Sequence, residues 1–115
     1  MGSSEGFRVI IQSPKPAAEA FAIATADLHA EDPEVALHPD DLTAVYDTTD
    51  GDHRVQGIIE VEAQASGGSQ LTYGMAVDFG GVVGRFGFIR RRMAAMMQRG
   101  IAEDLEADLD GEWVA

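Results

Sequence analysis

The 115-residue sequence contains no cysteine, a single lysine and no long apolar segment. Without cysteine, the chain has no disulfides, no thiolate metal ligands and no cysteine nucleophile. No apolar run approaches the ~20 residues that a membrane-spanning helix needs, so we expect no membrane span. The first ten residues also lack the charged start and apolar stretch of a signal peptide. We therefore expect a soluble, cytoplasmic protein.

Cationic side chains are scarce. The chain has 8 lysines and arginines against 20 aspartates and glutamates, which gives a net charge of −12. Such a carboxylate-rich, lysine-poor surface suits a salt-rich cytoplasm, where high ionic strength screens the repulsion among the acids. We therefore predict a halophilic source, with an acidic protein from an ordinary cytoplasm as the alternative. The broad negative field also disfavours nucleic acid as a partner.

The chain is long enough for one domain, 1–115, and we expect residues 1–6 to be flexible. Alternating apolar residues predict four strands, at 7–13, 42–49, 53–65 and 71–79. Helical spacing predicts two helices, at 17–28 and 86–109. The proline-rich, acidic segment 29–41 is predicted to be a loop with room for one helical turn. The order β-α-β-β-β-α indicates an α+β domain whose long C-terminal helix packs across the last two strands of an antiparallel sheet.

Two segments carry a family resemblance: FRVIIQSPKPAAEAFAIATADL at 7–28 and GGSQLTYGMAVDFGGVVGRFGFIRRRMAAMMQRGIAEDL at 67–105. They resemble the START-like (SRPBCC) superfamily of polyketide cyclase/dehydrase and lipid-transport proteins. The resemblance implies a helix-grip fold, with an apolar cavity between a curved sheet and the long helix, and a buried Phe21. It also implies binding of a hydrophobic molecule. Segment 42–65 supplies fewer strands than this family usually has, so a shortened sheet is expected.

The apolar side chains predicted to line the space between sheet and helix have two interpretations. On spacing alone they form an ordinary core, whereas the resemblance makes them the wall of a ligand cavity. Methionine favours the cavity slightly, because flexible thioethers adapt to varied apolar ligands. The candidate ligand-binding residues are Phe21, Tyr46, Ile59, Tyr73, Met75, Val77, Phe79, Ile89, Met93, Met96 and Met97.

Segment 79–102 is a basic island that holds five of the eight cations and no carboxylate. Arg85, Arg90, Arg91 and Arg92 lie near the start of the predicted helix, where the helix dipole disfavours cations. Something else should therefore stabilise them. The alternatives are acidic partners within the chain, a partner protein or second subunit, and the anionic group of a ligand at the cavity mouth.

Three functions fit these observations. The first is a START-like module that binds a small hydrophobic or amphipathic molecule. The alternative is an interaction module that dimerises through the basic, Met-rich helix or a free sheet edge. A cyclase or hydrolase is the third, although only Tyr46, Tyr73 and Asp78 offer acid–base groups, and alternation turns Asp78 away from the cavity. The sequence has no recognisable cofactor or metal motif, so we expect neither a cofactor nor a metal. An enclosed apolar volume of about 300 Å³ would favour the first function over the second.

Overall fold

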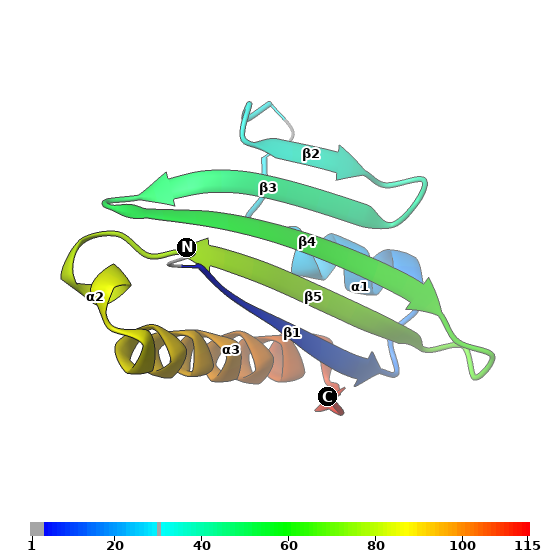
Figure 1. Ribbon diagram of the computed structural model, residues 1–115. Helices are drawn as coiled ribbons and strands as arrows, with labels where there is room; N and C mark the ends of the chain where they lie inside the picture. The colour runs from blue at the N-terminus through cyan, green and yellow to red at the C-terminus, as the bar shows by residue number, and fades with distance from the viewer. Residues whose placement is uncertain (1–3, 30) are drawn as a thin grey trace.

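The fold is a six-stranded antiparallel sheet with one short and one long helix packed on it (Figure 1). The structure is a computed structural model that describes residues 4–29 and 31–115. Its sheet order is β2-β3-β4-β5-β1-β6. The elements are β1 (Ser4–Ser13), α1 (Ala17–Ala24), β2 (Val35–His38), β3 (Thr43–Asp50), β4 (His53–Ala63), β5 (Ser69–Asp78), α2 (Gly81–Arg85), α3 (Gly87–Leu109) and β6 (Glu112–Trp113). The predicted α+β class, with its long C-terminal helix, is confirmed.

The segment 29–41 differs from its prediction as a loop, because it contains the strand β2. Val35 pairs with Tyr46 and Leu37 with Ala44, so β2 extends the sheet beyond β3. Its four residues lie between prolines and carry only two inward apolar side chains, too short a pattern to identify a strand. The short elements α2 and β6 also went unpredicted. Of the segment predicted to be flexible, residues 4–6 belong to β1, and residues 1–3 lie outside the described residues.

The main core lies where α1 and the C-terminal half of α3 meet the inner face of the sheet. Alternation along the strands supplies its inward side chains, and Val9, Ile11 and Leu71 are completely buried. The alanines Ala20 and Ala102 are also fully buried, so α1 and α3 approach closely. This end of the molecule therefore has the dense packing that holds the domain together.

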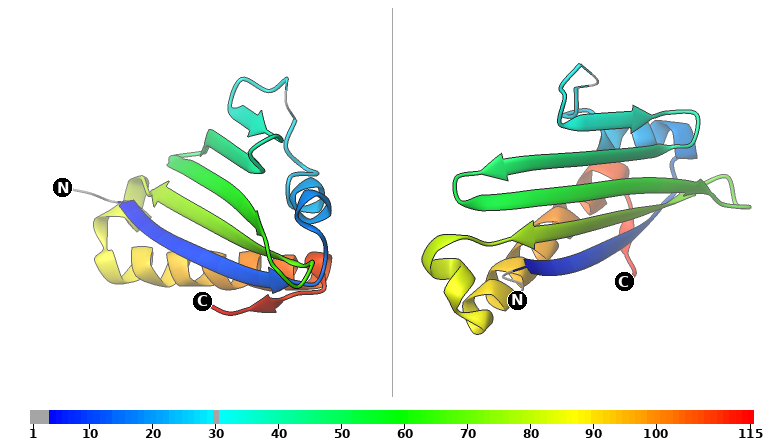
Figure 2. Two further views of the ribbon diagram at one scale, coloured as in Figure 1. Left: turned by 90° about the vertical axis from the view of Figure 1, so that its right-hand side faces the viewer. Right: turned by 45° about the horizontal axis from the view of Figure 1, so that its top comes forward.

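The long helix α3 packs chiefly against β1 and α1, and not across the last two strands as predicted (Figures 1 and 2). Its buried residues are Ala94, Ala102, Leu105 and Leu109. The predicted apolar stripe is therefore wrong in its first half, where Met93 and Met96 are 36% and 64% exposed. Small alanines allow the helix backbone to lie close to β1, and this contact turns the methionines outward.

Candidate functional site

A groove of about 290 Å³ opens between α1, the inner face of the sheet and the C-terminal half of α3. Its lining comes from α1, from the sheet and from α3, so the groove forms only when the domain is folded. The groove is open to solvent, and its volume lies just below the ~300 Å³ at which small-molecule sites usually begin, so it is not the enclosed cavity that the resemblance implied. The lining residues are Ile23, Ala24, Asp27, Leu28, Tyr46, Ile59, Tyr73, Ile101, Asp104, Leu105 and Asp108.

Two tyrosines provide the polar groups inside this groove. Tyr46 on β3 and Tyr73 on β5 meet across β4, and their hydroxyls form a hydrogen bond with each other. Their rings lie 6.5 Å apart between centroids in an edge-on arrangement of 62°. Because one hydroxyl donates to the other, one O–H of the pair remains able to donate to a ligand. These are also the only tyrosines of the chain.

Gly57 on β4 makes the tyrosine pair sterically feasible. It lies directly opposite Tyr46 in the register, and a Cβ at this position would overlap the Tyr46 ring. A glycine inside a strand often marks a bend or a bulge. The pairing with β3 and β5 instead runs through Gly57 without interruption, so its role is to leave room for an aromatic ring.

Partial burial raises the pKa of both hydroxyls above the ordinary tyrosine value. For Tyr73 the hydrogen bond to Tyr46 adds to the effect of burial, and its pKa lies far above the usual range. Both side chains therefore stay protonated at neutral pH. They can hold a ligand by hydrogen bonds, but they are poorly suited to act as bases.

The mouth of the groove carries carboxylates and no arginine. Asp27 lies in the turn that follows α1, and Asp104 and Asp108 come from successive turns of α3; all three are exposed. Negative charge around the mouth disfavours an anionic ligand. The groove is better suited to a neutral molecule, or to a cationic amine that pairs with one of these carboxylates.

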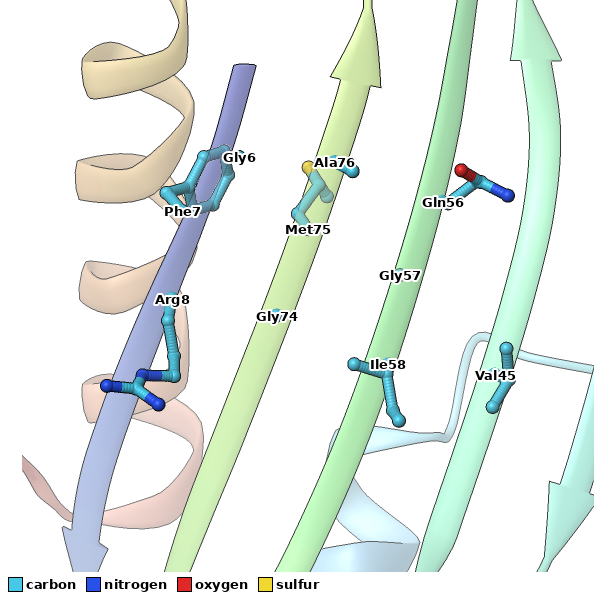
Figure 3. Close-up of a pocket in the computed structure, with 10 residues that line it drawn as sticks. All are labelled: Gly6, Phe7, Arg8, Val45, Gln56, Gly57, Ile58, Gly74, Met75 and Ala76. Carbon is cyan, nitrogen blue, oxygen red and sulfur yellow. The ribbon is translucent and has the colours of Figure 1, made fainter. Parts of the chain in front are cut away.

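A second hollow, of about 480 Å³, lies on the outer face of the sheet, which no described helix covers (Figure 3). Arg8, Val45, Gln56, Ile58 and Ala76 project from this face by strand alternation, and glycines Gly6 and Gly74 flatten it. The hollow is wide open and has few polar groups, so it resembles a bare sheet surface more than a ligand site. Sequence reasoning missed it, although Val45 and Ile58 stand out as apolar residues in outward positions.

The structure brings together three of the residues predicted to bind a ligand, Tyr46, Ile59 and Tyr73. Three others are buried in packing: Phe21 in the main core, and Val77 and Phe79 at the far end of β5, where Phe79 contacts His53 edge-on. The remaining five lie outside the groove. Met75 faces Phe7 in the sheet register, and the others lie along the N-terminal half of α3, namely Ile89, Met93, Met96 and Met97.

The predicted polar contacts, the arginines, also lie outside the groove. Arg90 donates from its guanidinium to the backbone oxygen of Gly84 at 2.6 Å, which links α3 to α2. Arg85, Arg91 and Arg92 are exposed. Within the described part of the chain, none of these four arginines forms an ion pair with a carboxylate, so pairing inside the chain does not explain them. The described residues also contain no group of three metal-ligating side chains placed to hold an ion.

No protein-family model and no curated protein matches the sequence. Solved structures do match it over nearly the whole chain. The Zhui aromatase/cyclase from Streptomyces sp. R1128 aligns with a TM-score of 0.70 at 14% identity, covering 93% of this chain and 92% of that one. TTHA0849 from Thermus thermophilus aligns with a TM-score of 0.69 at 14% identity, covering 91% and 97%. Ara h 8.0201 aligns with a TM-score of 0.62 at 15% identity, covering 90% and 96%. The START-like fold is thereby confirmed, and identities this low show the fold alone.

Proposed function

We propose that this protein binds a small, largely apolar molecule in the groove between α1, the sheet and α3. The observation that carries the proposal is the pair of protonated tyrosines, Tyr46 and Tyr73, set among apolar side chains of three different elements. The groove combines polar groups with apolar side chains, so it can hold a small molecule by both hydrogen bonds and apolar contact. The fold shared with an aromatase/cyclase is consistent with this function.

The ligand is neutral or carries an amine, and it has a hydroxyl or carbonyl group. The free O–H of the tyrosine pair donates to this oxygen, and the apolar remainder packs on Ile59 and Leu105. The carboxylates at the mouth disfavour acids such as fatty acids. The ligand's polar group therefore meets the tyrosines, in place of the arginines that the sequence favoured.

We propose binding in preference to catalysis, because neither tyrosine is activated as a base. Their raised pKa values favour the protonated form. Asp78, the third candidate group for a cyclase or hydrolase, projects from the outer face of the sheet and so points away from the groove. The tyrosines orient a bound molecule by donating hydrogen bonds.

Replacing either of two alanines on α1 with phenylalanine tests the groove. Ala24 lines it, whereas Ala22 is exposed on the same helix. Native mass spectrometry of protein expressed in its own host should show a small-molecule adduct on the unaltered chain and on Ala22→Phe. Ala24→Phe, which fills the groove, should lose the adduct while keeping the helical circular dichroism signal. Absence of any adduct on the unaltered chain, or an adduct on Ala24→Phe equal to that on Ala22→Phe, would overturn the proposal.

A dimerising module is the second candidate, and the exposed apolar side chains of the outer sheet face favour it. Val45 and Ile58 are 39% and 38% exposed beside each other on β3 and β4. If this face forms a homodimer, light scattering should give twice the monomer mass. The double variant Val45→Ser/Ile58→Ser should then give the monomer mass. A monomer before substitution would discard this candidate.

A further inference from the structure

Five large apolar side chains are exposed on α2 and the first half of α3. Val82, Phe86, Phe88, Met93 and Met96 range from 36% to 67% exposed. These elements form one end of the molecule, away from the main core (Figure 1). The ring centroids of Phe86 and Phe88 lie 6.3 Å apart, so these two side chains form a continuous apolar surface. An exposed apolar patch of this kind marks an interaction site.

Arginines are interleaved with these apolar residues. Phe88, Arg92, Met96 and Arg99 follow one another at helical spacing, so they form a single stripe on the exposed side of α3. Arg91 lies beside this stripe on α3, Arg85 ends α2, and both are exposed. Segment 79–102 has no carboxylate, and its charge of +5 contrasts with −17 for the other residues. We call α2, the linking residue Phe86 and residues 87–99 of α3 the basic end.

The partner of the basic end must offer anionic groups next to apolar ones. A symmetric contact between two copies would oppose arginines to arginines, which is repulsive. The surface of an anionic bilayer supplies both requirements at once, phosphates for the arginines and acyl chains for the aromatic rings. No described helix is long and apolar enough to cross a membrane, so the contact would be peripheral.

We propose that the basic end docks onto the surface of an anionic lipid bilayer. Phe86 and Phe88 enter the boundary between headgroups and acyl chains, and Arg91 and Arg92 contact lipid phosphates. The acidic remainder of the chain is repelled by the same surface, so the protein docks in one orientation. Trp113, beyond the other end of α3, stays in water in this orientation. The inference is independent of the proposed groove function.

Vesicle flotation tests the docking. Vesicles of phosphatidylcholine and phosphatidylglycerol in equal parts should carry the protein upward at low salt, and phosphatidylcholine vesicles should not. Arg91→Gln/Arg92→Gln should lower the partition coefficient for the anionic vesicles on the order of tenfold or more. The control Arg8→Gln/Arg54→Gln removes the same charge from the sheet and should leave binding unchanged. Phe86→Ser/Phe88→Ser should also lose binding, whereas Val45→Ser/Ile58→Ser should not.

Fluorescence tests the orientation without depending on loss of binding. The native Trp113 should keep its emission when anionic vesicles are added. In the double variant Phe88→Trp/Trp113→Phe the emission should shift to the blue. The docking proposal would be overturned by no flotation with anionic vesicles, by equal loss in the two arginine pairs, or by unshifted emission from that double variant. It would also be overturned if light scattering showed a dimer that Phe86→Ser/Phe88→Ser dissociates, because the basic end would then contact protein.

Discussion

The two halves of α3 belong to one continuous helix but differ in which side chains they bury and in the sign of their charge. The C-terminal half buries Ala102, Leu105 and Leu109 and carries several acids. The N-terminal half buries only Ala94, exposes Met93 and Met96, and carries arginines in place of acids. The first half has the more hydrophobic appearance in the sequence, yet the second half forms the core.

The difference shows that neighbouring elements, more than composition, decide which face of a helix is buried. The C-terminal half lies against α1 and β1, and the chain after it returns to pair as β6 with β1. The N-terminal half has β1 on one side and the short α2 at its start. One half of α3 therefore anchors the helix, and the other half leaves its large side chains exposed.

The largest expected effect is a difference in stability between the two halves. Leu109→Ala removes a fully buried side chain and should lower the free energy of unfolding by about 2–5 kcal/mol. Met96→Ala, at 64% exposure, should change it by less than about 0.5 kcal/mol. Urea unfolding followed by circular dichroism measures both. Similar losses in the two variants would mean that the N-terminal half is packed after all.

A smaller loss is expected on the groove side of the sheet. Gly57→Ala places a Cβ against the Tyr46 ring and should push that ring out of the groove. We expect a loss of about 1–3 kcal/mol of unfolding free energy, together with loss of any bound molecule. Gly74→Ala on the outer face, where a Cβ would lie 3.1 Å from the Cγ2 methyl of Ile58 and away from the groove, is the control for binding. If Gly57→Ala still binds the ligand, the tyrosine pair does not contribute to the binding site.

The tyrosine pair should also make stability depend on alkaline pH. Its folded-state pKa values are raised above the ordinary 10.0, mainly by burial, so folding favours the protonated hydroxyls. The pair's contribution to the free energy of unfolding is fully present below pH 10, and it is lost as the pH rises from 10 through the folded-state pKa values. Tyrosinate absorbance should appear at higher pH in the folded chain than in urea. Coincident titrations would show that the two hydroxyls are open to water.

The smallest effect is expected on the free side of α3. Gly100 lies within the helix, and a Cβ there would meet nothing within 4 Å. Gly100→Ala should therefore raise the free energy of unfolding by about 0.5–1 kcal/mol, because alanine loses less backbone entropy in a helix. Thermal unfolding measures the gain. A decrease would show that this side of α3 contacts another part of the protein.

Strong periodicity predicted much of the fold from the sequence. The alternation along β5 and the span of α3 match the structure within two residues, because both patterns run through long elements. The strand β2 was missed because four residues provide too little pattern. The rotation of α3 was missed because methionine is more hydrophobic than alanine, whereas close approach to β1 selects the smaller side chain.

The candidate site was only partly visible in the sequence. Tyr46, Ile59 and Tyr73, three of the predicted ligand-binding residues, lie around one groove in the structure. Their role in binding stays a proposal. The carboxylate rim was not foreseen, because Asp27 and Asp104 lie far apart in the sequence and meet only through the contact of α1 with α3. A single sequence gives periodicity within elements but not the contacts between them.

The two outermost strands have a consequence for how this protein behaves at high concentration. The sheet ends in a four-residue strand, β2, on one side and in a two-residue strand, β6, on the other. β6 pairs with only Ile11 and Gln12 of β1, and β2 pairs with only residues 43–46 of β3, so each short strand covers part of its border. Short edge strands are one way in which natural sheets resist aggregation. Among the described residues, positions 4–9 of β1 have no strand partner on the side away from β5, and they lie beside the N-terminal half of α3. A strand from another molecule would therefore add there, next to the basic end, before it added at β2 or β6.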